Sequence, residues 1–343
     1  MTHPPPLSRD RLLHLIQRMK SSRVVVIGDI MIDRYLYGET ERLSPEAPVP
    51  VVTVRDRTAK LGGAANVAAN VASMGASCLL VGAVGDDGDG AAIRQELVVA
   101  RLDGRHVVTI AGRPTTSKTR IIARAQQIVR IDDEVDALLD GPDLDRLIRS
   151  ASEALADADA LLLEDYNKGA LAPTLIAEVM AVARRRGIPV VVDPKYRQFF
   201  AYAGATVFKP NRRELESALG AAVDLQDRNA IPEVLARLKV DNMLVTLGAD
   251  GMLLVMKDGS SLRIPSIARQ VFDVSGAGDT VTAWLGTALA AGASLVEAAQ
   301  LANYAAGVEV SKPGVATVSP EEVLAVHEER FDQIGRLRRG GVI

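Results

Sequence analysis

The amino-acid sequence predicts an α/β fold, a doubly wound and mainly parallel sheet flanked by helices. Short apolar runs that end in Gly, Asp or Asn recur along the chain, and helical patterns lie between most of them. Of the 343 residues, 48% are hydrophobic and 3% are aromatic, so the core must consist mainly of Ala, Val, Leu and Ile. Such a core suits helices that pack on a parallel sheet. A chain of this length forms one large domain or two smaller ones.

The predicted elements follow one another in a regular order. After a Pro-rich start, an amphipathic helix is expected over Arg11–Lys20. The predicted strands of the main sheet are Arg23–Asp29, Cys78–Gly82, Ala160–Asp165, Pro189–Asp193, Ala205–Asn211 and Met243–Gly248. In sheets of this kind, ligands bind outside the carboxyl ends of the strands. The polar residues at these ends, which we expect to face one crevice, are Asp29, Asp165, Asp193, Asn211 and Thr246.

Two segments interrupt this alternation and predict a small antiparallel β lid over residues of about 34–55 and 115–132. Val49–Arg55 and Thr116–Asp132 have the composition of extended strands, and the second carries several arginines among β-branched residues. An ordinary edge hairpin with solvated basic residues explains the same pattern equally well. The sequence alone therefore leaves both interpretations open.

Charge and composition exclude several classes of protein. The chain has 40 basic and 43 acidic residues, so no general attraction to nucleic acid or anionic lipid is indicated. The single cysteine, Cys78, lies in an apolar run and predicts a buried thiol in a reducing compartment. No secretory signal is recognisable at the start, and the uncharged stretch Thr280–Val296 predicts a buried helix rather than a membrane span. We expect a cytoplasmic protein with neither nucleic acid nor membrane as a partner.

The strongest functional signal is the run Asp273–Thr280, which reads Asp-Val-Ser-Gly-Ala-Gly-Asp-Thr. Gly276, Ala277 and Gly278 place backbone amides with little side-chain bulk at the start of a predicted helix, where anions such as phosphate bind. Asp279 would repel a resting phosphate, but it could accept a proton from a hydroxyl group that attacks the phosphate. A plain helix cap is the competing interpretation for this aspartate.

A second glycine pair, Gly62 and Gly63, precedes another predicted helix. Glycines there let a ligand lie against the backbone, and Asn66 offers both donors and acceptors to hydroxyl groups. A tight turn between strand and helix would need the same glycines. Together with Asp29 and Asp33, however, the pattern favours a sugar site, because carboxylates accept hydrogen bonds from vicinal hydroxyls.

Asn211 and Glu214 have the spacing of a capping box at the start of a helix. The same side chains could instead orient a Mg²⁺-bound water or a nucleotide phosphate. The segment Thr246–Gly251 could line a nucleotide or form a plain hairpin turn. The four histidines are scattered, and no Walker loop is present, which argues against a zinc centre, a Ser-His-Asp triad and a P-loop NTPase.

Taken together, Gly62–Asn66 and Asp273–Thr280 resemble the two fingerprints of the ribokinase-like (PfkB) sugar kinases. More narrowly, Gly28–Tyr35 and the run Arg42–Pro50 are similar to the D-glycero-β-D-manno-heptose-7-phosphate kinases of bacterial ADP-heptose synthesis. Further segments that fit that group are Gln126–Asp132, Asp165–Leu171, Asp193–Lys195 and Gly314–Pro320. The departures are Ile32 and Leu43, Ser275 where Thr is usual, and Glu164 where a small residue is commoner.

The resemblance implies a kinase domain over residues 22–330, an N-terminal extension over 1–21 and a C-terminal tail over 331–343. It also implies transfer of the γ-phosphoryl group of ATP to the anomeric hydroxyl of heptose 7-phosphate, which gives the 1,7-bisphosphate. Asp279 would accept the proton of that hydroxyl, and the amides of Gly276, Ala277 and Gly278 would hold the developing charge. The product would lead towards ADP-heptose and lipopolysaccharide or another glycoconjugate.

The binding residues implied by the resemblance form three sets. Those expected to bind the sugar phosphate are Asp29, Asp33, Gly62, Gly63 and Asn66, with Arg120, Lys168 and Lys195 as candidates for the phosphate group. Those expected to bind ATP are Asn211, Arg212, Arg213, Glu214, Thr246, Gly248, Gly251 and Asn303, with Glu214 also reaching Mg²⁺ through water. A monovalent cation such as K⁺ is expected at Asp273 and Ser275, beside the backbone of residues 310–319.

The resemblance further implies a homodimer that pairs through the lid. It implies a separate adenylyltransferase as well, because the nucleotidylyltransferase half of some fused relatives does not follow in this sequence. Two alternatives stay open: a kinase for another sugar or sugar phosphate, and a catalytically silent regulator that binds a sugar or nucleotide on the same fold. A binding protein has no need for a base, so the presence of Asp279 with both glycines speaks against the second alternative.

Overall fold

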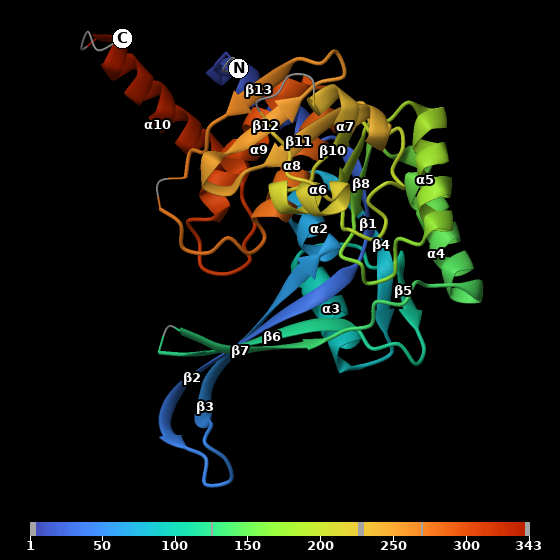
Figure 1. Cartoon of the computed structure of the whole chain (residues 1–343), viewed down its shortest axis with the longest axis vertical. Helices are drawn as coiled ribbons and strands as arrows, with labels where there is room; N and C mark the ends of the chain where they lie inside the picture. Colours follow the sequence, from blue (N-terminus) through green and yellow to red (C-terminus); the bar gives the residue numbers. More distant parts are fainter. Residues whose placement is uncertain (1–4, 125, 226–229, 269, 340–343) are drawn as a thin grey trace.

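The structure, a computed structural model, describes residues 5–124, 126–225, 230–268 and 270–339. Within these residues the body is built on a nine-stranded sheet in the order β13-β12-β11-β10-β9-β8-β1-β4-β5 (Figure 1). The strands are β1 (Arg23–Gly28), β4 (Ser77–Gly85), β5 (Val107–Ile110), β8 (Ala160–Glu164), β9 (Val190–Asp193), β10 (Val207–Phe208), β11 (Asn242–Thr246), β12 (Met252–Val255) and β13 (Ser261–Ile264). Pairing is parallel from β5 to β11 and antiparallel from β11 to β13. The predicted fold class is therefore confirmed.

Helices cover both faces of this sheet. They are α1 (Arg9–Met19), α2 (Ala64–Ser73), α3 (Gly88–Val99), α4 (Gly141–Ala154), α5 (Pro173–Arg186), α6 (Arg212–Leu219), α7 (Ala230–Leu238), α8 (Ala277–Ala290), α9 (Leu295–Glu309) and α10 (Pro320–Arg339). Strand β1 shows how the two layers arise, because its side chains alternate between faces. Val24 and Val26 join the core under α2 and α8, whereas Val25 and Ile27 join the core under α4 and α5.

Helix α8, which carries the predicted anion motif at its start, lies directly on the sheet. A Cβ atom at Gly286 would fall 2.0 Å from Leu162 Cδ2 of β8, so this position requires glycine. The first residues of α8 are thereby held at the carboxyl ends of the central strands. The predicted buried helix in this region and the predicted burial of Cys78 are confirmed.

The lid is a separate four-stranded sheet that extends away from the body (Figure 1). Its strands are β2 (Ile30–Leu43), β3 (Pro50–Gly63), β6 (Thr116–Ala123) and β7 (Gln126–Asp133), in the order β3-β2-β6-β7. The two outer pairs are antiparallel, and β2 and β6 join them through a parallel pair that the sequence did not predict. The small sheet is therefore confirmed over the ordinary edge hairpin, and its strands continue into the body as far as Ile30 and Gly63.

The predicted N-terminal helix is confirmed as α1, and it packs into the body. Leu12, Leu15 and Met19 are buried, and the Arg11 guanidinium group forms an ion pair with Glu297 of α9 at 2.7 Å. None of the helices in the described part of the chain combines the length and apolar character that a membrane crossing requires.

Candidate active site

Asp279 lies in the first turn of α8, at the carboxyl edge of the sheet, and is 4% exposed. Gly276, with a φ of 92°, occupies the N-cap, and the Asp279 carboxylate makes no capping bond. Its Oδ1 accepts a hydrogen bond from the Tyr166 hydroxyl at 2.5 Å, and its Oδ2 accepts one from Asn66 Nδ2 at 2.8 Å. The interpretation of Asp279 as a plain helix cap is therefore wrong.

Burial raises the pKa of the Asp279 carboxyl to about 6. The negative charge of Asp193 raises this pKa further, whereas the hydrogen bonds from Tyr166 and Asn66 and the charge of Lys209 lower it. A carboxyl group with a pKa near neutrality is still ionised at pH 7, and it binds a proton more tightly than a solvated aspartate. These are the properties of a general base.

A buried cluster of charged groups lies beside this base. One carboxylate oxygen from each of Glu164, Asp193 and Asp279 lies within 4.8 Å of the others, and Lys209 Nζ lies 2.8 Å from Asp193 Oδ2. Among the described residues, neither oxygen of the fully buried Glu164 finds a hydrogen-bond partner, and burial raises its pKa well above the usual value. Because the Lys209 ammonium group already supplies positive charge here, we do not assign the cluster as a metal centre.

Several of the residues predicted to bind the sugar meet where the lid joins the body. Arg120 Nη1 of β6 lies 2.5 Å from Asp33 Oδ1 of β2, and both side chains are largely buried. A Cβ atom at Gly62 would fall 2.4 Å from Asp33 Oδ2, so a side chain at position 62 would displace the Asp33 carboxylate. Gly63, with a φ of 56°, then starts α2 and directs Asn66 towards Asp279. The contacts described here thus link the lid to the Asp279 carboxylate. They involve Asp33, Arg120, Gly62 and Asn66.

Asp29 is buried and holds the loop that follows β8. Its Oδ2 accepts the amides of Tyr166 and Lys168, both at 2.8 Å, and its Oδ1 accepts the amide of Ala170 at 2.9 Å. Both carboxylate oxygens therefore organise residues 166–170, a role that the sequence did not predict for this aspartate. Burial nevertheless raises the pKa of Asp29, because the three amides offset only part of the cost of desolvation.

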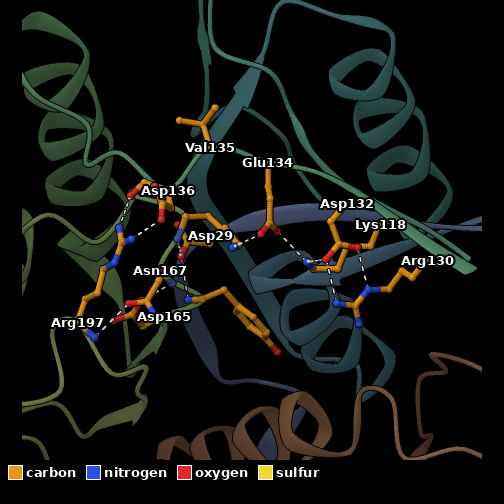
Figure 2. Close-up of polar contacts among 12 residues, drawn as sticks. Asp29, Lys118, Arg130, Asp132, Glu134, Val135, Asp136, Asp165, Asn167 and Arg197 are labelled. Carbon is orange, nitrogen blue, oxygen red and sulfur yellow. Dashed lines mark hydrogen bonds and ion pairs between the residues drawn. The ribbon is translucent and has the colours of Figure 1, made fainter.

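The three cations expected near the substrate phosphate all have carboxylate partners. Arg120 pairs with Asp33, Lys168 Nζ lies 2.7 Å from Glu134, and Lys195 pairs with Glu214. Figure 2 shows Glu134 at the end of the lid, pointing towards Lys118, whose Nζ lies 2.8 Å from it. In the same view Arg197 pairs with Asp136, so the segment that follows β7 is fixed to the body by ion pairs at two points.

Most of the predicted nucleotide residues line one cavity, at the start of α6 and the turn between β11 and β12. The capping box is confirmed, because Glu214 N donates to Asn211 Oδ1 at 2.9 Å and Asn211 N donates to Glu214 Oε2 at 2.8 Å. A cavity of about 510 Å³ is lined by Asn211, Arg212, Arg213, Thr246 and Gly248, with Arg263 beside them. The hairpin interpretation of Thr246–Gly251 is also confirmed, since β11 and β12 pair antiparallel around this turn.

Three residues of the nucleotide set do not line this cavity: Glu214, which closes the capping box, and Asn303 and Gly251. Asn303 is buried and its Nδ2 donates to Pro265 O at 3.0 Å. Gly251 has a φ of 84°, and a Cβ atom there would fall 2.2 Å from Ile264 O. Both residues hold the segment that follows β13. A second cavity, of about 750 Å³, opens beside that segment and is lined by Ser266, Ile267, Gly307, Val308 and Ser311 together with residues of α10.

The loop before the anion motif lies against the end of α9. The amides of Phe272 and Asp273 donate to Val310 O at 2.7 and 3.3 Å, and Ser275 N donates to Asp273 Oδ1 at 2.9 Å. Glu309 is buried beside Gly276, and within the described residues its carboxylate has no hydrogen-bond partner. Burial raises its pKa to about 8, and the negative charges of Asp273 and Asp279 raise it too. The charges of Asp273 and Asp279 thus create a negative potential around Glu309, which a cation at this point would offset.

The sequence interpretation missed Tyr166 and Lys209. Tyr166 lies inside Asp165–Leu171, a segment used for the resemblance, but the tyrosine itself was given no chemical role. Lys209 follows β10 directly, and a lysine at the end of a buried strand is the only sign of its position in the sequence. Tyr166 contacts Asp279 itself, and Lys209 contacts Asp193 beside it. Neither contact is between neighbours in the sequence, so a local pattern cannot reveal it.

Comparisons with known proteins agree with this geometry. Residues 21–322 match the family described as pfkB family carbohydrate kinase. "Bifunctional protein HldE" of Rhodospirillum rubrum is 44% identical over 93% of this chain and 65% of its own length. The protein of the same name from Trichlorobacter lovleyi is 41% identical over 98% of this chain and 69% of its own length. The chain thus spans about two thirds of the length of these relatives.

Solved structures of the same architecture include ribokinase of Arabidopsis thaliana complexed with ribose and ATP, with a TM-score of 0.70 and 22% identity. It covers 90% of this chain and 99% of its own. Phosphofructokinase-2 of Escherichia coli in complex with potassium has a TM-score of 0.74 and 19% identity, and covers 90% of this chain and 98% of its own. At these identities the likeness shows the ribokinase-like fold. The chain belongs to the pfkB family of carbohydrate kinases.

Proposed function

We propose that this kinase transfers the γ-phosphoryl group of ATP to the anomeric hydroxyl of D-glycero-β-D-manno-heptose 7-phosphate. Support comes from the HldE relatives, which are 41–45% identical over most of the chain, and from the segments Gly28–Tyr35 and Arg42–Pro50. The observation that carries the proposal is the buried Asp279 carboxylate at the start of α8. It accepts a hydrogen bond from Asn66, one of the residues proposed to bind the sugar.

In this reaction the anomeric oxygen forms a bond to the γ-phosphorus while its O–H bond breaks, and Asp279 accepts the proton. The bond from the γ-phosphorus to the bridging oxygen breaks, and ADP leaves with that electron pair. The amides of Gly276, Ala277 and Gly278 hold the negative charge of the group in transfer, aided by the dipole of α8. A side chain at Gly278 would lie 3.6 Å from Lys209 Nζ, so the lysine adds positive charge beside the same turn.

For ATP, we assign the phosphates to the side of the cavity lined by Asn211, Arg212, Arg213, Thr246 and Gly248, because its arginines complement their charge. The second cavity, with Ile267 and Val308 in its wall, suits the nucleobase. Asn303 and Gly251 would shape the segment between the two cavities.

The residues present also fit metal ions. Both oxygens of Glu214 already accept from Asn211 and Lys195, so this carboxylate would reach Mg²⁺ through water. Mg²⁺, when bound, neutralises the charge of the phosphates. Asp273 and Ser275 would hold a monovalent cation such as K⁺ in the negative potential beside Val310.

A homodimer that pairs through the lid completes the proposal. Leu43, Val49 and Ile131 of the lid are large apolar side chains that are more than half exposed, which is typical of a surface that a second copy covers. The sugar bisphosphate would then need an adenylyltransferase for the next step towards an ADP-sugar, and we expect a separate protein to supply it.

A panel of sugars with ATP tests the substrate. Heptose 7-phosphate should give the highest kcat/KM, and preference for an unphosphorylated pentose would refute the heptose assignment.

The variant Asp279→Asn tests the role of Asp279 as the general base. It should lower kcat by at least about 100-fold while ATP still binds. Asp145→Asn, an exposed change on α4, is the matched control and should leave kcat unchanged. Near-normal turnover in Asp279→Asn would refute the role of Asp279.

A further inference from the structure

Tyr166 contacts the general base directly, although it does not belong to either glycine motif. Its hydroxyl donates to Asp279 Oδ1 at 2.5 Å, while Asn66 Nδ2 donates to Oδ2 at 2.8 Å. Each oxygen of the buried carboxylate therefore has one neutral donor. Two such contacts fix the rotation of the carboxylate group, and the remaining lone pairs stay available to a substrate hydroxyl.

The position of the tyrosine is fixed by its own loop. Asp29 accepts the amides of Tyr166, Lys168 and Ala170, all within 2.9 Å, and Asp165 Oδ1 accepts the amide of Asn167 at 2.8 Å. Two buried carboxylates thus hold the amide of the tyrosine and the backbone that follows it. This loop sets the phenol in place before any substrate arrives, which is a requirement for a group that positions a catalytic side chain.

The ring of Tyr166 is also held. The Lys195 ammonium group lies 5.3 Å from the centre of the ring, and this lysine is itself paired with Glu214. A cation over the face of a phenol is attracted to the ring. The ring therefore lies between Asp279 and Lys195, a candidate for the substrate phosphate whose partner Glu214 belongs to the nucleotide set.

Several charged groups surround Asp279, and the Tyr166 hydroxyl acts on its carboxylate together with them. Carboxyl groups face it from β8 (Glu164), from β9 (Asp193) and from the end of α9 (Glu309), and Lys209 opposes them from the end of β10. Burial raises the pKa of Asp279 to about 6, and the hydrogen bond from Tyr166 is the first of the contributions that lower it. A donor hydroxyl stabilises the ionised carboxylate, which is the form that can accept a proton.

We propose that Tyr166 is a positioning residue for phosphoryl transfer, whose hydroxyl orients the Asp279 carboxylate and keeps it ionised at neutral pH. This inference rests on the proposed role of Asp279 as the general base. It adds a residue from the loop after β8 to a site otherwise built from glycine turns and strand ends.

The test is the pH profile of Tyr166→Phe. In the wild type, kcat/KM should fall as the pH drops through about 6, because Asp279 becomes protonated. Loss of the hydroxyl removes a contact that favours the ionised form, so the acid limb should move to higher pH. A move of about one unit would lower kcat/KM about tenfold below the limb. Activity should recover towards the wild-type value at high pH.

Tyr202→Phe is the matched control. Its hydroxyl is also buried and donates to a carboxylate of the same loop, Asp165 Oδ2, at 2.8 Å. This variant removes an equal hydroxyl without touching the base, so its acid limb should stay at the wild-type position. An acid limb that does not move in Tyr166→Phe would overturn the proposal, whether or not kcat falls uniformly with pH.

A second substitution covers the case in which Tyr166→Phe does not fold. Tyr166→fluorotyrosine keeps the shape of the ring and makes the phenol a stronger donor, so the acid limb should move to lower pH. An unmoved limb would again count against the proposal. Failure of the proposed base is distinguishable, because Asp279→Asn would then keep its activity regardless of the result at Tyr166.

Discussion

The ammonium group of Lys209 lies 2.8 Å from Oδ2 of Asp193, and both side chains are buried beside the first turn of α8. Asp193 belongs to a cluster of three carboxyl groups with Glu164 and Asp279, and the charge of Lys209 lowers the pKa of both Glu164 and Asp279. A buried charge without a partner is far more costly than a solvated one. The positive charge of Lys209 therefore makes it possible to bury Glu164 and Asp193 beside Asp279.

Lys209→Met should lower the free energy of unfolding by about 3–5 kcal/mol, because it removes the ion-pair partner of the buried Asp193. Denaturant unfolding at pH 7 measures this loss. The control is Lys257→Met, which removes an ion pair to Asp241 from a lysine side chain that is 76% exposed and should cost less than about 1 kcal/mol. Equal losses in the two variants would contradict the structural role of Lys209.

Glu164→Gln should leave the protein at least as stable as the wild type at pH 8. Burial and the neighbouring carboxylates raise the pKa of Glu164 in the folded state, whereas the unfolded chain has the ordinary value near 4.5. The folded state thus binds the proton more tightly, so the wild type loses stability as the pH rises above about 4.5 towards the raised pKa. Glutamine resembles the protonated acid and does not titrate.

Unfolding free energies from pH 4.5 to 8 check this expectation. The difference between Glu164→Gln and the wild type should move in favour of the variant with rising pH. Glu178→Gln, a change on the exposed face of α5, should show no such trend. A wild type that becomes more stable than Glu164→Gln with increasing pH would show that the carboxyl is ionised in the folded protein.

Gly276→Ala should impair catalysis as well as stability. The residue has a φ of 92°, and a Cβ atom would fall 3.1 Å from Glu309 Oε1 and 3.2 Å from Asn66 Nδ2. The strain of the left-handed backbone costs roughly 1–2 kcal/mol, and displacement of Asn66 disturbs its bond to Asp279. We expect kcat to fall at least about tenfold, as for loss of one contact to a developing charge.

Gly187→Ala separates the two effects. Gly187 ends α5 with a φ of 66°, and a Cβ atom there meets nothing within 4 Å. This variant should show a similar loss in thermal stability with an unchanged kcat. If kcat falls equally in both variants, contact of the new Cβ atom with Asn66 and Glu309 does not explain the loss of activity in Gly276→Ala.

Arg120→Met should raise KM for the sugar substrate about tenfold and leave the affinity for ATP unchanged. The substitution removes the partner of the largely buried Asp33 at the base of the lid. A residue that binds substrate and transition state alike acts mainly on KM. Arg130→Met, a change of the same type in the lid at a half-exposed ion pair with Asp132, is the control and should leave KM unchanged. A loss confined to kcat in Arg120→Met would place the arginine in the chemical step instead.

Parts of the site that lie close together in the sequence could be predicted from it. Gly276, Gly278 and Asp279 stand within four positions, and helix geometry alone brings them together. The capping box of Asn211 and Glu214 is equally local, and it was predicted for the same reason.

Contacts between distant segments could not be predicted. Tyr166 lies 113 residues before Asp279, and Lys209 reaches Asp193 from the following strand. Their approach depends on strand order and on the direction of each loop, which apolar patterns do not encode. Asp29 shows a further limit, because a carboxylate at the end of a strand can organise a loop as well as a ligand.

Strands β2 and β3 pair from the outer end of the lid, through two register shifts, to Asp33 and Gly62, which lie against each other at the proposed sugar site. The hairpin therefore connects its outer end directly to Asp33 and to Arg120, the partner of Asp33. If a second copy of the chain covers the outer end, as proposed, it would act on the same two strands that carry these groups. Contacts between the copies would then influence the proposed sugar site without touching any atom that reacts.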